Sequence, residues 1–355
     1  MRISKRRASI GVTLGLITLA GGLLVWTFAY AGWQEAWSAL RALHFWQIAL
    51  LLSLNLGIVA LFSARWWYLL RLQGFKVPFL SAVVYRLAGF GVSYLTPGPQ
   101  FGGEGWLLVL LRRRHAVPLT EGGASVALDK LIEILSNFSF LGLGLLISLW
   151  LGIAHPALSA AMMLPMIGLL GVLFLLFAAL AGGILPASWL VKRLKFGLSA
   201  IGRLLHLVAQ AEQRSAGLIR QHLAQVIALY LYSLGIWVAM VGEYWLTLHF
   251  LGANANLSQT LFSLTAARLA FLTPLPGGLG ALEASQVAAL QILGLGASLG
   301  LSLSLLHRAR DLFLAFLGVF LGSLMHLRPR SRVPERPALD TRSVYPSRLP
   351  EEYDS

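Results

Sequence analysis

The sequence contains no cysteine, and only 12% of its residues are charged. Without cysteine the chain can form no disulfide framework, no thiolate metal site and no cysteine nucleophile. It also has no Walker-type phosphate loop and no aspartate pair with metal-binding spacing, which argues against an ATPase and against Mg²⁺-dependent prenyl or phosphoryl transfer. We therefore predict that the chain is not an enzyme, that it uses no cofactor and that it binds no metal.

Hydrophobic residues make up 57% of the chain, and its mean hydropathy is +0.74. Several apolar runs exceed the roughly 20 residues that cross a bilayer as a helix. The composition therefore predicts an all-α polytopic membrane protein with about six spans. We place these spans at 10–30, 47–70, 124–152, 157–182, 223–251 and 298–326.

Two further apolar regions, 79–112 and 258–295, are interrupted by proline and glycine. Irregular backbone at membrane depth is tolerated only where protein buries it or where it lines a cavity. Each region is therefore predicted to form a re-entrant helical hairpin. Paired interruptions in two halves of a chain are the best sequence indication of a transporter's binding site.

The two interrupted regions belong to a longer repeat. Arg65 and Glu243 begin similar aromatic segments, and we call the distance between them along the chain the repeat offset. Glu104 and Glu283, which follow the two turns, are separated by nearly the same distance. The predicted units, 47–152 and 223–326, start on opposite sides of the membrane, with 10–30 as an extra span and 157–182 as a linking span. This is an inverted-topology repeat, and its usual function is alternating access.

The net charge of +14 is explained by topology. Most basic residues fall in the N-terminus, in loops on one side of the membrane and in the tail, so the positive-inside rule places both termini in the cytoplasm. We predict a bacterial or archaeal cytoplasmic membrane protein that binds no nucleic acid. The membrane domain would span 1–327, with 186–222 as an amphipathic cytoplasmic linker and 328–355 as a disordered cytoplasmic tail.

Ionisable residues within spans are costly, so they are functional candidates, although each could equally be a structural tie. Asp129 follows Glu104 at the same spacing at which Arg308 follows Glu283, so each hairpin carboxylate is predicted to meet a charged residue on the following span. We interpret Arg65 and Glu243, which flank aromatic residues, as snorkelling toward the interface. The whole set is Arg65, Arg86, Glu104, Asp129, Lys130, Glu133, Glu243, Arg268, Glu283, Arg308, Arg310 and Asp311.

The residues after each turn would begin a half-helix, and free N–H groups at a helix N-terminus suit an anionic head group such as phosphate. Without a nucleotide site, movement of a substrate would be downhill or ion-coupled, and Asp129, Glu133, Glu283 and Asp311 could carry protons. The predicted substrate-binding set is Thr96, Pro97, Pro99, Gly102, Gly103, Glu104, Asp129, Thr273, Pro274, Pro276, Gly277, Gly278, Gly280, Glu283, Arg308 and Asp311.

These motifs resemble a known family. The Thr96-Pro97-Gly98-Pro99 turn with its following Gly-Gly-Glu, and the Pro-Gly-Gly-x-Gly-x-x-Glu turn that ends at Glu283, resemble the transmembrane region of lysylphosphatidylglycerol synthases (flippase-like, UPF0104). The resemblance covers roughly residues 10–326. It implies a lipid translocase, here a stand-alone member without the synthase domain, whose partners are membrane lipids with anionic, aminoacylated or glycosylated head groups. A lipid-synthesis enzyme could act alongside it.

We therefore predict a lipid flippase or transporter that works by alternating access. One alternative is a membrane-embedded transferase acting on a lipid carrier, with a carboxylate or His307 as the base. His307 and Asp311 are four residues apart and could meet on one helix face as a base and its orienting acid. The other alternative is an accessory scaffold for envelope lipid synthesis.

Overall fold

The computed structural model describes residue 18 and residues 21–95, 102–150, 152, 156–194, 200–273, 275 and 278–327. All regular secondary structure in these ranges is helical. Several predictions lie outside the described residues. They concern the first half of the 10–30 span, the 328–355 tail, and the turn residues Thr96, Pro97, Pro99, Pro274, Pro276 and Gly277.

The two predicted units each contain a long helix, two short helices and a second long helix. In the first unit these are α3 (Phe45–Leu72), α4 (Phe79–Leu95), α5 (Gly103–His115) and α6 (Leu119–Trp150). In the second they are α10 (Leu223–Phe250), α11 (Leu257–Ala270), α12 (Ala281–Ile292) and α13 (Ala297–Leu327). The four long helices, α3, α6, α10 and α13, are long and apolar enough to cross a membrane. The protein is an all-α membrane protein.

The remaining helices surround the two units. Residues Gly21–Tyr30 form a short apolar helix, followed by α2 (Trp33–Arg41), while α7 (Pro156–Ala181) connects the units. The segment predicted as one amphipathic stretch, 186–222, forms two helices, α8 (Pro186–Leu194) and α9 (Ala200–Gln221). Helix α9 packs against both α6 and α7, so part of its apolar face is covered by protein.

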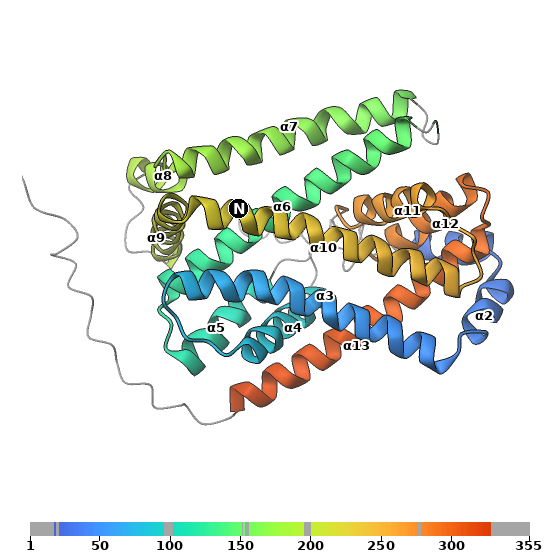
Figure 1. The fold of residues 1–355 in the computed structure, drawn as a ribbon, viewed down its shortest axis with the longest axis horizontal. Coiled ribbons are helices and arrows are strands. Elements are labelled where there is room, and N and C mark those ends of the chain that lie inside the picture. The colour runs from blue at the N-terminus through green and yellow to red at the C-terminus, as the bar shows by residue number, and fades with distance from the viewer. Residues whose placement is uncertain are drawn as a thin grey trace, which may run out of the picture.

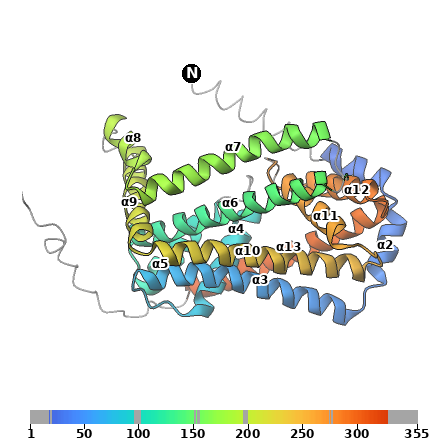
Figure 2. The same cartoon turned by 45° about the horizontal axis from the view of Figure 1, so that its top comes forward.

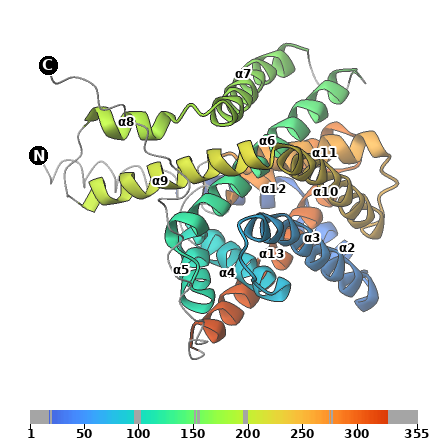
Figure 3. The same ribbon diagram turned by 60° about the vertical axis from the view of Figure 1, so that its left-hand side comes forward.

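The short-helix hairpins lie at opposite ends of the bundle (Figures 1 and 2). Hairpin α4–α5 lies at the same end as α8 and α9, which we call the α9 end, whereas α11–α12 lies at the same end as α2, which we call the α2 end. The long helices run between these ends, and Figure 3 shows them grouped side by side. The units therefore run antiparallel to each other, as an inverted repeat requires.

Each hairpin also packs against a long helix of the other unit. Helix α4 packs against α13, and α11 packs against α6. The α4–α13 contact is close because Gly318 has no side chain: a Cβ there would lie 2.0 Å from the Leu87 carbonyl oxygen. Small residues allow such close approach between membrane helices. The two units are thus interlocked through their hairpins.

Local contacts repeat with the same spacing as the sequence. Trp67 Nε1 donates to the Val77 carbonyl at 2.8 Å. Trp245, which stands one repeat offset after Trp67, donates through its Nε1 to the Ala255 carbonyl at 3.0 Å. Both bonds link the end of a long helix to the loop that precedes the hairpin. The alignment drawn from sequence therefore corresponds to equivalent positions in three dimensions.

Candidate functional site

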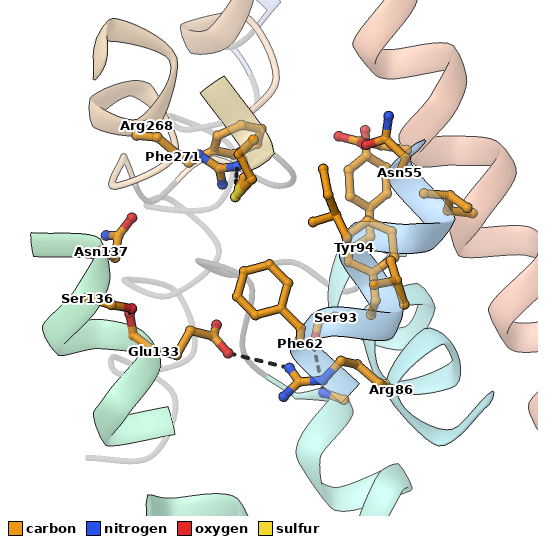
Figure 4. A pocket seen from close by; sticks show the side chains of 18 of the residues that line it. Asn55, Phe62, Arg86, Ser93, Tyr94, Glu133, Ser136, Asn137, Arg268 and Phe271 are labelled. Atoms are coloured by element: carbon orange, nitrogen blue, oxygen red, sulfur yellow. Dashed lines mark hydrogen bonds and ion pairs between the residues drawn. The ribbon is translucent and has the colours of Figure 1, made fainter. Parts of the chain in front are cut away.

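A cavity of about 590 Å³ lies between the two units and is lined by the helices of both. Small-molecule sites commonly have about 300–1,000 Å³. In Figure 4, Arg268 and Asn137 lie on one wall, and Asn55 and Tyr94 lie on the opposite wall. Charged side chains and aromatic rings, among them Phe62 and Trp237, line it together. We refer to it as the central cavity.

On the first unit's side, the carboxylates of Asp129 and Glu133 are surrounded by cations. Arg65 Nε lies 2.7 Å from Asp129 Oδ1, and its Nη2 lies 3.3 Å from Glu133 Oε2. Arg86 pairs with the same two carboxylates, and Lys130 Nζ lies 2.9 Å from Glu133 Oε1. The Arg65 side chain is 0% exposed, so the snorkelling interpretation is wrong for this residue.

On the second unit's side, Arg310 forms ion pairs with two carboxylates. Its Nη2 lies 2.8 Å from Asp311 Oδ1, whereas its Nη1 lies 3.5 Å from Glu243 Oε1. Asn55 of α3 donates to the same Glu243 oxygen at 3.0 Å. Glu243 is only 6% exposed, so snorkelling does not describe it either.

These two groups of side chains can be compared across the repeat, because Arg65 and Glu243 occupy equivalent positions and carry opposite charges. The α6 latch consists of Arg65, Ser233, Asp129 and Glu133; the α13 latch consists of Glu243, Asn55, Arg310 and Asp311. Arg65 of α3 contacts Ser233 of α10 at 3.0 Å, and Glu243 of α10 contacts Asn55 of α3. The repeat offset that separates Arg65 from Glu243 also separates Asn55 from Ser233. In the α6 latch the cation Arg65 faces two carboxylates of α6, whereas in the α13 latch the carboxylate of Glu243 faces the cation Arg310.

Arg268 differs from the other cations that line the central cavity. Its guanidinium lies over the Trp237 ring, 5.0 Å from the centroid, and its Nη2 lies 3.9 Å from Met240 Sδ. Within the described part of the chain, no carboxylate forms an ion pair with it, whereas Arg86, Lys130 and Arg310 all have such partners. Its charge is therefore the one most available to a ligand.

Four residues of the predicted substrate-binding set line the central cavity: Gly103, Glu104, Asp129 and Asp311. Glu104 pairs with Lys130 at 3.5 Å rather than with the expected Asp129, because a carboxylate on this helix is stabilised by a neighbouring cation and not by another carboxylate. The Gly102 amide also donates to Glu104 at 2.9 Å.

The other described residues of that set do not line the cavity. Arg308 Nε lies 2.7 Å from Glu283 Oε1, as their spacing in the sequence predicts, and its Nη2 donates to the Gly278 carbonyl at 2.8 Å. The Gly280 amide donates to Glu283 at 2.8 Å. The N-terminus of α12 is therefore capped by its own carboxylate, and it is not offered to a ligand. Thr273 donates locally to the Ala270 carbonyl.

Sequence reasoning missed the polar residues of the wall that carry no charge, notably Asn55, Ser93, Tyr94 and Asn137. A usable signal existed for Asn55, because Ser233, one repeat offset later, is a second polar residue at an equivalent apolar-helix position. No hydrogen bond joins His307 to Asp311 among the described residues, and His307 Nε2 has no partner there. Those residues also contain no cluster of His, Asp and Glu side chains that could hold a metal.

The sequence that forms the two units and the central cavity matches a known family. The model of the lysylphosphatidylglycerol synthase TM region matches residues 10–318. The chain belongs to this family. The match begins before the helix Gly21–Tyr30 and ends within α13, so it includes every helix that lines the cavity.

A second comparison matches the chain to a relative over most of the length of both. A UPF0104 membrane protein of Pyrococcus horikoshii is 22% identical over 345 residues, which cover 90% of this chain and 96% of the relative. Membership of the lysylphosphatidylglycerol synthase TM region family, together with the long apolar helices, makes this chain a multi-pass membrane protein.

Proposed function

We propose that this protein is a transporter rather than an enzyme, and that it moves a lipid with an anionic or modified head group between leaflets by alternating access. The observation that carries the proposal is the central cavity, which is lined by two antiparallel units. In inverted-repeat transporters the substrate site lies at the interface of the repeats near the bilayer midplane.

Arg268 is the group that we assign to head-group recognition. A guanidinium can donate two parallel hydrogen bonds to phosphate oxygens, and these bonds are stronger than neutral ones. The Trp237 ring beneath Arg268 holds the guanidinium by a cation–π contact. Every carboxylate of the cavity wall already has a basic partner. The charge that remains available in the wall is therefore positive, that of Arg268, and it favours an anionic ligand.

The two latches provide the elements of alternating access. In this conformation the α6 latch is tight, with Arg65 at 2.7 Å from Asp129, and the α13 latch is loose, with Arg310 at 3.5 Å from Glu243. In the opposite conformation we expect the α13 latch to be tight and the α6 latch to be loose. A bound head group would favour one state by interacting with it more strongly.

We place the protein in the cytoplasmic membrane with both termini and the α9 end facing the cytoplasm. Arg112, Arg113 and Arg114 end α5 at that end, in agreement with the positive-inside rule. Because the chain lacks cysteine, single substitutions test this placement directly. In intact cells an impermeant maleimide should label Ser38→Cys in α2 and leave Gln221→Cys in α9 unlabelled; the reverse pattern would invert the topology.

The transport proposal is tested in proteoliposomes containing fluorescent phosphatidylglycerol or phosphatidylcholine, with dithionite quenching to follow movement between leaflets. We expect wild-type protein to move phosphatidylglycerol and Arg268→Gln to slow this about tenfold or more, because hydrogen bonds to charged groups contribute about 1.5–3 kcal/mol. Arg41→Gln is the matched control, since Arg41 is exposed and also lies 5.0 Å from a tryptophan ring centroid.

Two results would reject the proposal. Wild-type protein that moves neither lipid, with or without a pH gradient, is not a flippase of these lipids. Protein that converts a lipid carrier to a new product when given a donor is a transferase. Equal slowing by Arg41→Gln and Arg268→Gln would remove Arg268 from head-group recognition.

A further inference from the structure

A second cavity, of about 250 Å³, lies between α3, α10 and α13. Its walls are mostly apolar: Ile48, Leu51 and Leu52 come from α3, and Leu306, Ala309 and Phe313 come from α13. We call this cavity the α13 seam. Its α3 residues belong to the first turns of that helix, so the seam lies in the half of the bundle toward the α2 end.

The seam adjoins the central cavity. Glu243, His307 and Arg310 line both, so the α13 latch forms the partition between a charged chamber and an apolar one. A ligand that filled both would need a polar part and an apolar part joined directly. A membrane lipid has this structure.

The seam exists because the bundle departs from its own repeat symmetry. Helix α6 packs against both α3 and α10. Its equivalent, α13, meets α10 through side chains, with the His307 and Tyr244 rings 5.0 Å apart and Arg310 Nη1 3.5 Å from Glu243 Oε1, and an apolar cavity lies beside these contacts. The α3–α10 pair therefore packs closely along α6, where Arg65 binds Asp129, and leaves an apolar cavity along α13.

The α13 seam also reaches the outer surface of the helix bundle. Ile48 is 43% exposed and Phe313 is 49% exposed, and Ala309 is also exposed. Leu312 and Phe316 continue this apolar surface along α13. In a multi-pass membrane protein, exposed apolar helix surface at this depth contacts acyl chains.

We propose that the α13 seam binds an acyl chain of the anionic lipid whose head group occupies the central cavity, with the latch residues between them. The inference rests on the proposed function, because that supplies the head-group site. The seam faces the leaflet at the α2 end, which is the outer leaflet in the topology given above. It would be the lateral passage between the central cavity and that leaflet, since the equivalent passage at α6 is closed.

The seam is tested by photolabelling in proteoliposomes with two probes, phosphatidylglycerol and phosphatidylcholine, that carry the same diazirine acyl chain. Labelled peptides are mapped on α3, α13 and α7. We expect phosphatidylglycerol to label the α3 and α13 seam peptides at least threefold more than phosphatidylcholine. The exposed residues Ile167 and Leu175 of α7 report contact with bulk lipid, and both probes should label them equally.

Two substitutions make the test specific. Ala309→Trp fills the seam and should reduce phosphatidylglycerol labelling there to the phosphatidylcholine level. Ala239→Trp is the matched control, because Ala239 is an exposed alanine on α10 that lines neither cavity, and it should keep the preference. Size-exclusion profiles check that both variants remain folded.

The outcomes separate the seam from the transport function. Equal labelling of the seam by both probes in wild-type protein overturns the seam, even if fluorescent phosphatidylglycerol still crosses the bilayer and the proposed function stands. Preferential labelling that Ala309→Trp removes supports the seam, even if no lipid crosses and the proposed function fails. Preferential labelling that persists in Ala309→Trp at full strength places the chain elsewhere and also overturns the proposal.

Discussion

Helices α6 and α13 hold equivalent places in the two inverted units, but their surroundings differ. Helix α6 packs against α3 and α10, whereas α13 leaves a cavity beside them. At α6 the buried cation Arg65 is shared by two carboxylates of that helix. At α13 the carboxylate of Glu243 meets a cation, Arg310, whose shorter contact is to Asp311.

This difference shows how one scaffold can hold two unlike interfaces. The repeated tryptophan contacts and the hairpins supply the same frame in each unit. The charged residues of the two latches differ, and in this conformation the α6 latch has the shorter contact. A tight and a loose latch at symmetry-related positions are what one end state of an alternating mechanism requires.

The largest expected effect comes from opening the α6 latch. Arg65→Gln leaves the buried Asp129 and the half-buried Glu133 each with one cation fewer, and breaking a buried ion pair from one side costs about 3–5 kcal/mol. Unfolding in mixed detergent micelles, followed by tryptophan fluorescence, measures the loss of free energy. A loss below about 1 kcal/mol would mean that the α6 latch is no tighter than the α13 latch.

The next effect concerns how each long helix packs on the hairpin of the other unit. At Gly318 a Cβ meets a backbone oxygen at 2.0 Å, whereas at Gly144 it meets the Thr265 hydroxyl at 2.1 Å, and that side chain can rotate. We expect Gly318→Ala to lower the unfolding free energy by about 1–3 kcal/mol. Gly144→Ala should cost less than about 1 kcal/mol, because alanine also favours the helix. Equal losses would contradict the difference in packing.

A smaller effect is expected at the loose latch. In Glu243→Gln the amide can still accept from Asn55, and Arg310 keeps Asp311 at 2.8 Å, so the loss should be about 1 kcal/mol. The same unfolding measurement applies, with Arg65→Gln as the reference. If Glu243→Gln destabilises the protein as much as Arg65→Gln does, the two latches contribute equally to the free energy of unfolding, and their different distances do not reflect different strengths.

The smallest expected difference lies where the units are alike. Trp67→Phe and Trp245→Phe each remove one indole hydrogen bond to a loop carbonyl, and each should cost about 0.5–1.5 kcal/mol. The two losses should agree within about 0.5 kcal/mol, which is the usual spread for independent sites. A larger gap would show that the asymmetry extends beyond the α6 and α13 latches.

The repeat was predictable because equivalent residues recur at a nearly constant spacing along the chain. The repeat offset between Arg65 and Glu243 is visible in the sequence, and it recurs in the tryptophan contacts and in the latches. The ion pair of Glu283 and Arg308 was also predictable. Proline and glycine mark where helices must break, so the positions of the hairpins followed as well.

The composition of the central cavity was predicted only in part. Spacing along one helix shows which residues are neighbours on that helix, and it gave Asp129 and Asp311 as candidates. It does not show which face of α11 points inward. The sequence therefore did not single out Arg268 among the twelve intramembrane charged residues. It also placed Arg65 at the interface, although the structure buries this side chain completely.

The sequence by itself determined an all-α membrane protein with two inverted units, because hydropathy, charge and helix-breaking residues act locally along the chain. Only the tertiary structure decided that the ion pair of Glu283 and Arg308 does not line the central cavity, while Arg268 lines it without a carboxylate partner among the described residues. The physical reason is that pairing energies depend on distances between helices, and these distances are set by packing of the whole bundle.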